Sequence, residues 1–155
     1  MSRETKEVNR QALETHNWQR TLGIENEKQL RALHGAPPLK YSKRLALNAQ
    51  SYAEHLAKYD LFDHSDGGNY GENLIVRKGP GSTQLTGHFT QLVWRDTEKV
   101  GFGVARSKDN KAIYIVAHYF PSGNYKKEYK KNVLPPERGR LYIPTNRDLS
   151  KLKAF

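Results

Sequence analysis

Two histidines and a glutamate stand in polar, glycine-containing segments near the middle of the chain. His64 lies in Asp63-His64-Ser65, Glu72 lies in Gly71-Glu72-Asn73, and His88 lies at the junction of a loop with a short predicted helix. Imidazole nitrogens and carboxylate oxygens are suitable ligands for zinc. The same groups could exchange protons with a substrate as general acid and base. Sequence spacing does not show that they converge, so hydrogen-bonded loop residues without a metal are the alternative.

Other kinds of catalytic chemistry lack their signatures in this sequence. The chain has no cysteine and no Gly-x-Ser-x-Gly segment, so it has neither a Cys–His pair nor the nucleophile turn of the serine hydrolases. A phosphate-binding loop and a dinucleotide-binding glycine pattern are also absent. His16, His34, His55 and His118 fall in predicted helices or strands or beside them, where a structural or solvent-facing role is the simpler interpretation.

Apolar periodicity predicts three helices in the first part of the chain. They cover residues 5–21, 25–33 and 43–59. The third has the clearest apolar stripe, and Ser42 is a plausible N-cap for it.

After residue 99 the apolar pattern changes to the period of a strand. Residues 100–104 and 112–120 alternate as strands, and the second has apolar residues on both faces, so it needs cover on both sides. Helices before such strands predict helix–sheet–helix layering. Between them, residues 60–73 read as loop, and the breaker cluster Gly79-Pro80-Gly81-Ser82 interrupts residues 75–86.

Length, charge and cysteine content limit the class of protein. The 155 residues predict one domain. A formal net charge of +10 favours anionic partners such as phospholipid headgroups, and no nucleic-acid-binding motif accompanies it. The absence of cysteine favours a reducing, intracellular compartment. We find no apolar run typical of a signal peptide or a membrane span, and Ser2 does not fit a myristoylation motif.

One basic segment follows the strands. Residues 126–131 carry four lysines around Glu128 and Tyr129, and residues 138–155 add a further excess of arginine and lysine. We expect these lysines to contact anionic lipid; a solvated surface without a partner is the alternative. The four are Lys126, Lys127, Lys130 and Lys131.

Four short motifs, in order along the chain, resemble those of the CAP superfamily, which contains the cysteine-rich secretory, antigen 5 and pathogenesis-related 1 proteins (the SCP domain). Residues 87–97 (GHFTQLVWRDT) are similar to the first signature and residues 115–125 (IVAHYFPSGNY) to the second. Shorter matches occur at 16–20 and 71–74. Ala117 stands where secreted members usually carry cysteine, so the resemblance is strongest to the disulfide-free, Golgi-associated branch.

The resemblance implies an α+β fold, a three-layer α-β-α sandwich with a short central antiparallel sheet. We expect a CAP domain over residues 1–136, with an insertion around 21–33, and a basic C-terminal extension over 137–155. The segment 75–86 is much shorter than in the family, where it includes a helix with a second cleft glutamate. That helix is predicted to be missing, which should expose apolar surface of the strands.

The resemblance also implies a cleft with two histidines and two glutamates that binds zinc in some members. By motif match, His64 and His88 are the histidines and Glu72 is one glutamate. The function expected is a non-enzymatic binding module that associates with anionic membrane lipids or protein partners on the cytosolic face of the Golgi or other endomembranes. The alternatives are a metal-dependent, protease-like hydrolase cleft that uses the same three residues, a self-associating interaction protein such as a homodimer, and a shortened form without function.

Overall fold

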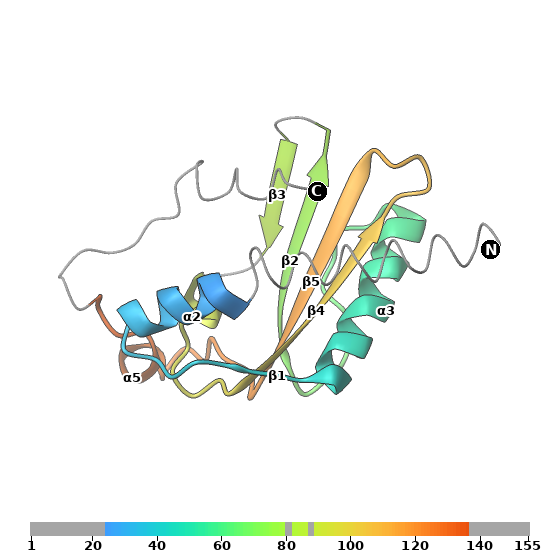
Figure 1. Cartoon of the computed structure of the whole chain (residues 1–155). Coiled ribbons are helices and arrows are strands. Elements are labelled where there is room, and N and C mark those ends of the chain that lie inside the picture. Colours follow the sequence, from blue (N-terminus) through green and yellow to red (C-terminus); the bar gives the residue numbers. More distant parts are fainter. Residues whose placement is uncertain (1–23, 80–81, 87–88, 137–155) are drawn as a thin grey trace.

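The structure, a computed structural model, describes residues 24–79, 82–86 and 89–136 (Figure 1). The helix predicted over 5–21, His88 and the extension over 137–155 therefore lie outside the described residues.

A five-stranded sheet in the order β1-β4-β5-β2-β3 forms the centre of the molecule. Its strands are β1 (Lys40–Tyr41), β2 (Gly71–Lys78), β3 (Ser82–Thr86), β4 (Lys99–Arg106) and β5 (Ala112–Phe120). The pairs β4–β5, β5–β2 and β2–β3 are antiparallel, whereas β1 runs parallel to β4. The antiparallel sheet that we expected is thus confirmed for four strands and corrected at β1.

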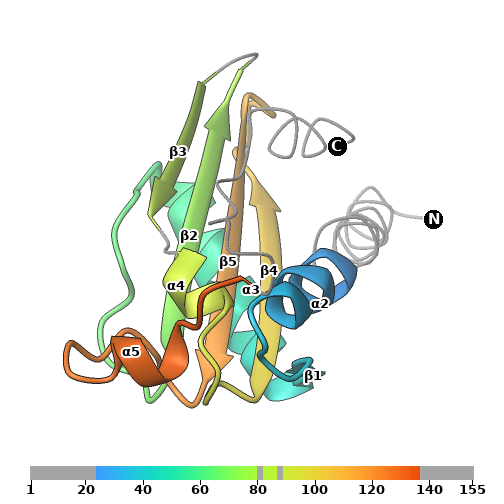
Figure 2. The same ribbon diagram turned by 90° about the vertical axis from the view of Figure 1, so that its left-hand side faces the viewer.

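Helices lie on both sides of this sheet. They are α2 (Ile24–Leu33), α3 (Lys43–Tyr59), α4 (Phe89–Leu92) and α5 (Tyr129–Asn132). Figure 2 shows α3 behind the sheet and α2, α4 and α5 in front of it. The predicted helix–sheet–helix sandwich is therefore confirmed.

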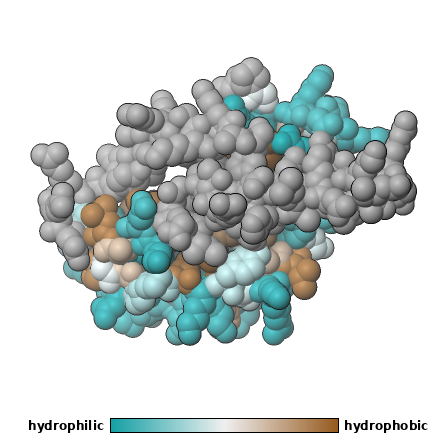
Figure 3. Space-filling view, in the orientation of Figure 1, coloured by the Kyte–Doolittle hydropathy of each residue, from teal (hydrophilic) through white to brown (hydrophobic). Residues whose placement is uncertain are grey.

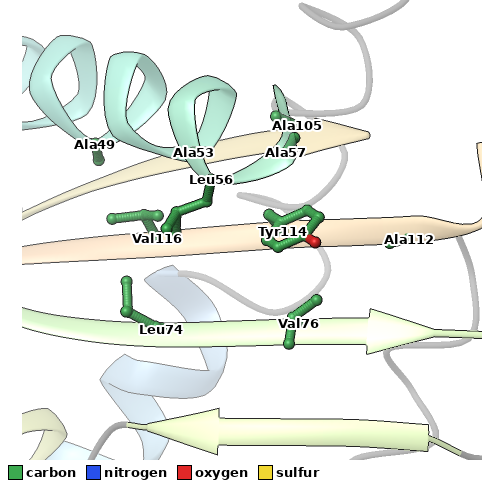
Figure 4. Packing of buried hydrophobic residues seen from close by; sticks show 10 residues of the cluster. All are labelled: Ala49, Ala53, Leu56, Ala57, Leu74, Val76, Ala105, Ala112, Tyr114 and Val116. Atoms are coloured by element: carbon green, nitrogen blue, oxygen red, sulfur yellow. The ribbon is translucent and has the colours of Figure 1, made fainter. Parts of the chain in front are cut away.

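The sequence of α3 explains both where it starts and which face it buries. The Ser42 hydroxyl accepts a hydrogen bond from the Leu45 N–H at 3.3 Å, as a helix N-cap does. At the other end Asp60 takes a left-handed conformation with φ of 50°. The buried stripe packs against β2 and β5 in one apolar cluster (Figure 4). From α3 the cluster contains Ala49, Ala53, Leu56 and Ala57, and Leu45 is buried against Gly101 at the start of the helix.

Two glycines of β4 bring the backbone of α3 close to the sheet. A methyl group on Gly103 would lie 2.3 Å from the backbone of Ala49 and Gln50, and Gly101 is as crowded against the start of α3. At this distance the Gln50 amide reaches β4: Val104 N–H donates to Oε1 and Nε2 donates to the Val104 carbonyl, both at 2.9 Å. Because β1 pairs only with the beginning of β4, Gln50 satisfies peptide groups beyond the end of β1.

The opposite face of the sheet is also buried. Val104 is 3% exposed and Ile115 is 6% exposed, so the predicted exposure of apolar strand surface is wrong. The self-association that this exposure was expected to cause loses its support. The cluster on this face comprises Leu39, Val100, Phe102, Val104, Ile115, Ala117 and Tyr119.

Helix α2 joins this face through polar groups. The Glu27 carboxyl accepts a hydrogen bond from the Tyr119 hydroxyl at 2.8 Å. Burial raises the pKa of Glu27 to about 8, because it outweighs the hydrogen bond from Tyr119 and the charge of Arg31, which both act to lower the pKa. The fully buried Arg31 donates to four carbonyl oxygens at 2.6–3.1 Å; they belong to Pro37, Leu92, Trp94 and Thr97.

The segment between α3 and α4 contains two strands that the sequence analysis did not predict. Residues 71–73, predicted as loop, begin β2, and the described part of 75–86 forms a β2–β3 hairpin where the family helix was predicted to be missing. Lys78 pairs with Ser82, whereas Pro80 and Gly81 of the breaker cluster lie outside the described residues. The apolar run that begins at Leu74 was the signal for β2, because Leu74 and Val76 are buried under α3.

Gly103→Ala should destabilise the protein by about 1–3 kcal/mol or more, because the new methyl group meets helix backbone that cannot rotate away. Urea denaturation measures the loss. Leu47→Ala on the exposed face of α3, where Leu47 is 72% exposed, is the control and should change stability by less than about 0.5 kcal/mol. Equal stability of the two variants would contradict the close helix–sheet contact.

Candidate functional site

The carboxylate of Glu72 is the centre of the polar cluster in the sheet. Antiparallel register places Glu72 of β2 directly opposite His118 of β5, so the two side chains share the face that α3 covers. His118 Nε2 lies 2.8 Å from Glu72 Oε2. The His118 side chain is fully buried and that of Glu72 is 7% exposed.

The loop that follows α3 adds three more hydrogen bonds to the same carboxylate. His64 Nδ1 lies 2.9 Å from Oε1, and the Ser65 N–H donates to Oε1 at 2.8 Å. The Ser65 hydroxyl donates to Oε2 at 2.6 Å. A carboxylate has about four lone-pair sites, so these bonds together with that from His118 saturate Glu72.

The hydrogen bonds decide the charge of Glu72. Burial by itself would raise the pKa of this carboxyl group, but the bonds from His118, Ser65 and His64 outweigh it and lower the pKa to about 2. Glu72 is therefore an anion over the whole physiological pH range.

Tyr70 covers the inner histidine. Its ring stacks on that of His118, with the ring centres 3.9 Å apart and the planes 21° from parallel. Its hydroxyl lies 3.2 Å from the Ser65 hydroxyl. Within the described part of the chain, His118 Nδ1 is buried and has no hydrogen-bond partner. Because Nε2 faces a carboxylate anion, we assign the ring proton to Nε2.

The outer histidine lines a small cleft. This cleft has a volume of about 290 Å³, and its wall includes His64, Glu72, Gln91 and Asn124. Gln91 is buried and ties the two signature segments together: Gly123 N–H donates to Gln91 Oε1 at 2.8 Å, and Gln91 Nε2 donates to Thr97 Oγ1 at 3.0 Å. Residues from 87–97 and 115–125 therefore meet beside His64 and Glu72.

The structure thus brings two of the three predicted site residues together, His64 and Glu72, whereas His88 lies outside the described residues. Sequence analysis missed His118, which it interpreted as structural. The signal was available only through strand pairing, because the register of β2 against β5 is needed to place His118 beside Glu72.

His64 and Glu72 differ in their ability to bind a metal. His64 uses Nδ1 toward Glu72, so Nε2 of its half-exposed ring is open to a ligand. Glu72 has no lone pair left for a metal while its four hydrogen bonds are formed. Among the described residues, no group of three or more His, Cys, Asp or Glu side chains could hold a metal ion.

The four lysines around α5 are not among the residues that line this cleft. Lys126, Lys127 and Lys130 are exposed. Lys131 is also exposed, but its ammonium group lies 2.8 Å from Asp96 Oδ2, which offsets its charge.

A match to a family model defines the class of this protein. The model of the CAP family, the cysteine-rich secretory protein family, matches residues 13–85 and 77–119. The chain therefore belongs to the CAP family, as the resemblance of its motifs predicted. The boundary between the two matched segments falls in the β2–β3 hairpin.

Particular relatives agree with this assignment. The chain is 34% identical over 161 residues to human Golgi-associated plant pathogenesis-related protein 1, covering 86% of this chain and 97% of the relative. It is 35% identical over 131 residues to pathogenesis-related protein 1A of Nicotiana tabacum, covering 68% and 76%. It is also 35% identical over 132 residues to protein PRY2 of Saccharomyces cerevisiae, but it spans only 40% of that protein's length and 72% of its own.

Solved structures show the same fold. BmVAL-1 superposes with a TM-score of 0.53 at 20% identity, covering 78% of this chain and 81% of that protein. NaASP2, crystallised with Zn²⁺, superposes with a TM-score of 0.51 at 21% identity, covering 66% and 78%. Among the described residues, no helix has the length and apolar character needed to cross a bilayer.

Glu72→Gln should weaken the folded state at neutral pH and become harmless in acid. The wild-type carboxyl has a pKa near 4.5 when unfolded and about 2 when folded, so its stabilisation is present above pH 4.5 and is lost as the pH falls toward 2. Urea denaturation at several pH values measures the difference between the two proteins. A difference that stays constant from pH 7 to pH 2 would contradict the ionised, hydrogen-bonded Glu72.

Proposed function

We propose that this CAP-domain protein is a non-enzymatic binding module that associates with anionic phospholipid on the cytosolic face of the Golgi or of other endomembranes. Its formal net charge of +10 is the observation that carries the proposal. The relative named as Golgi-associated, which the chain matches over nearly its whole length, supports the compartment.

The attraction is electrostatic in this proposal. Each lysine or arginine near an anionic membrane surface contributes about 1 kcal/mol, so a few exposed cations suffice for reversible binding. Lys126, Lys127 and Lys130 are exposed and remain candidates for this contact. Lys131 contributes less, because Asp96 lies beside it.

Binding to vesicles of phosphatidylcholine that contain phosphatidylinositol should weaken steeply as salt rises. The Debye length shrinks from about 30 Å at 0.01 M to about 3 Å at 1 M, which screens exposed cations from the lipid. Co-sedimentation with the vesicles over a salt series measures the loss, and pure phosphatidylcholine vesicles are the control. Binding that ignores salt, or no binding at low salt, would exclude this function.

A second candidate function, a zinc-dependent cleft, rests on the open Nε2 of His64. We propose that His64 and His88 would hold the metal, and that Glu72 would orient His64 through its hydrogen bond to Nδ1 rather than bind zinc itself. Zinc bound there would supply a Lewis acid. A hydrolase with this cleft would rely on the metal as its Lewis acid, because both ring nitrogens of His64 would be engaged, Nε2 by zinc and Nδ1 by Glu72.

Zinc titration calorimetry tests this arrangement. His64→Ala should abolish zinc binding, and Glu72→Gln should weaken it by about 10- to 100-fold, as the loss of an orienting carboxylate does. His55→Ala, on the exposed side of α3, is the matched control and should leave binding unchanged. If Glu72→Gln binds zinc as the wild type does, the orienting role is wrong, and if the wild type does not bind zinc, so is the metal site.

A further inference from the structure

One end of the sheet carries an open, basic hollow of about 1050 Å³. The ends of β2, β4 and β5 line it, and we call it the sheet-end hollow. Its wall carries five cationic side chains and two carboxylates. The cations are Arg77, Lys78, Arg106, Lys108 and Lys111, and the carboxylates are those of Asp60 and Asp109.

Strand register sets the spacing of the two arginines. Arg77 of β2 and Arg106 of β4 both pair with Ile113 of β5. Residues paired in neighbouring strands point to the same face, so the three side chains form one row. Two strand spacings of about 4.8 Å separate the arginine backbones. The row therefore presents two guanidinium groups on either side of a half-buried isoleucine.

Internal contacts occupy both carboxylates of the hollow. Asp60, at the end of α3, accepts a hydrogen bond from the Tyr114 hydroxyl and lies 2.7 Å from the Lys78 ammonium group. Asp109 accepts hydrogen bonds from the Ser107 hydroxyl at 2.6 Å and from the Lys111 N–H at 3.0 Å, which hold the β4–β5 turn. Asp60 therefore offsets the charge of Lys78, and the five cationic side chains still leave a formal excess of positive charge over the two carboxylates.

The hollow and the lysines around α5 lie at opposite ends of the molecule. In Figures 1 and 2 the β4–β5 turn and the end of β2 lie at one end of the sheet, whereas α5 lies at the other. In Figure 3 the end with the β4–β5 turn is hydrophilic. A flat membrane in contact with the β4–β5 turn cannot also touch α5. The sheet-end hollow and the lysines around α5 are therefore alternative surfaces for membrane contact.

We propose that the sheet-end hollow is the surface that docks on an anionic membrane and that its cations bind the phosphate of a lipid headgroup. This inference rests on the proposed function. Exposed ammonium groups, such as those of Lys108 and Lys111, attract phosphate as point charges. A phosphate on a membrane surface fits better than a buried ligand, because the hollow is open at the tip of the molecule and exposed lysines surround it.

Neutralising the turn lysines tests the location. Lys108→Gln with Lys111→Gln should weaken binding to phosphatidylinositol-containing vesicles by about 30-fold, the loss expected for two cations at the lipid surface. Lys126→Gln with Lys130→Gln removes the same charge from α5 and should weaken binding by less than about threefold. All four lysines are exposed, so both variants should fold, which circular dichroism verifies.

A fluorescent label gives a second, independent readout. Because the chain has no cysteine, Lys108→Cys and Lys127→Cys each provide one labelling site. A polarity-sensitive dye at position 108 should shift its emission to shorter wavelength when these vesicles are added. The same dye at position 127 should not.

These experiments distinguish an error in the location of the docking surface from an error in the proposed membrane binding. Losses in the predicted order, with the dye shift at 108 alone, support the hollow as the docking surface. A larger loss from the α5 variant, equal losses from both, or a dye shift only at 127 would overturn the hollow and leave anionic-membrane binding intact. No binding of the wild type to these vesicles at low salt would overturn both.

Discussion

One buried guanidinium group holds α2 to the wall of the cleft. A cation without water is tolerated only where polar groups replace its hydration, and four carbonyl oxygens do so around Arg31. Three of them come from the last residue of α4 and the short stretch that follows it. This stretch also supplies Thr97 to Gln91, and Gln91 in turn holds Gly123. The cleft wall therefore depends on Arg31, although Arg31 does not line the cleft.

On the other wall of the cleft, the Glu72 carboxylate has a similar role with the opposite charge. An anion is held there by donors from two elements that are distant in sequence, the loop after α3 and the strand β5. Both charges are fixed by hydrogen bonds within the fold, so neither is the origin of the attraction to an outside partner. In the function that we propose, that attraction would come from exposed cations at the ends of the molecule, so a cleft and a membrane-binding surface could coexist on one small domain.

The sequence predicted the helices α2 and α3 and the strands β4 and β5 because each has a clear apolar period and a recognisable start or turn, such as Ser42 before α3. It missed β2 because Gly71 and the polar residues around it suggested a loop, whereas the strand is stabilised by pairing with β5. It named His64 and Glu72 from family motifs but not His118. A residue that acts through its cross-strand neighbour is invisible until the register is known. The burial of the sheet face opposite α3 was also missed. The short segment between Leu74 and Gly87 suggested that a covering helix was lost, and its length does not show what else covers that face.

The hairpin has a consequence for how this molecule behaves when it is crowded. A helix satisfies its own peptide groups, but β3 is an edge strand whose outer side pairs with no other described strand. Such an edge can template the addition of a further strand from a neighbouring chain. At the other edge, β1 is only two residues long and offers almost no template. The two borders of the sheet therefore differ in their tendency to recruit another backbone, and strand addition between copies through β3 would stop at a pair, because β1 offers no second edge for growth.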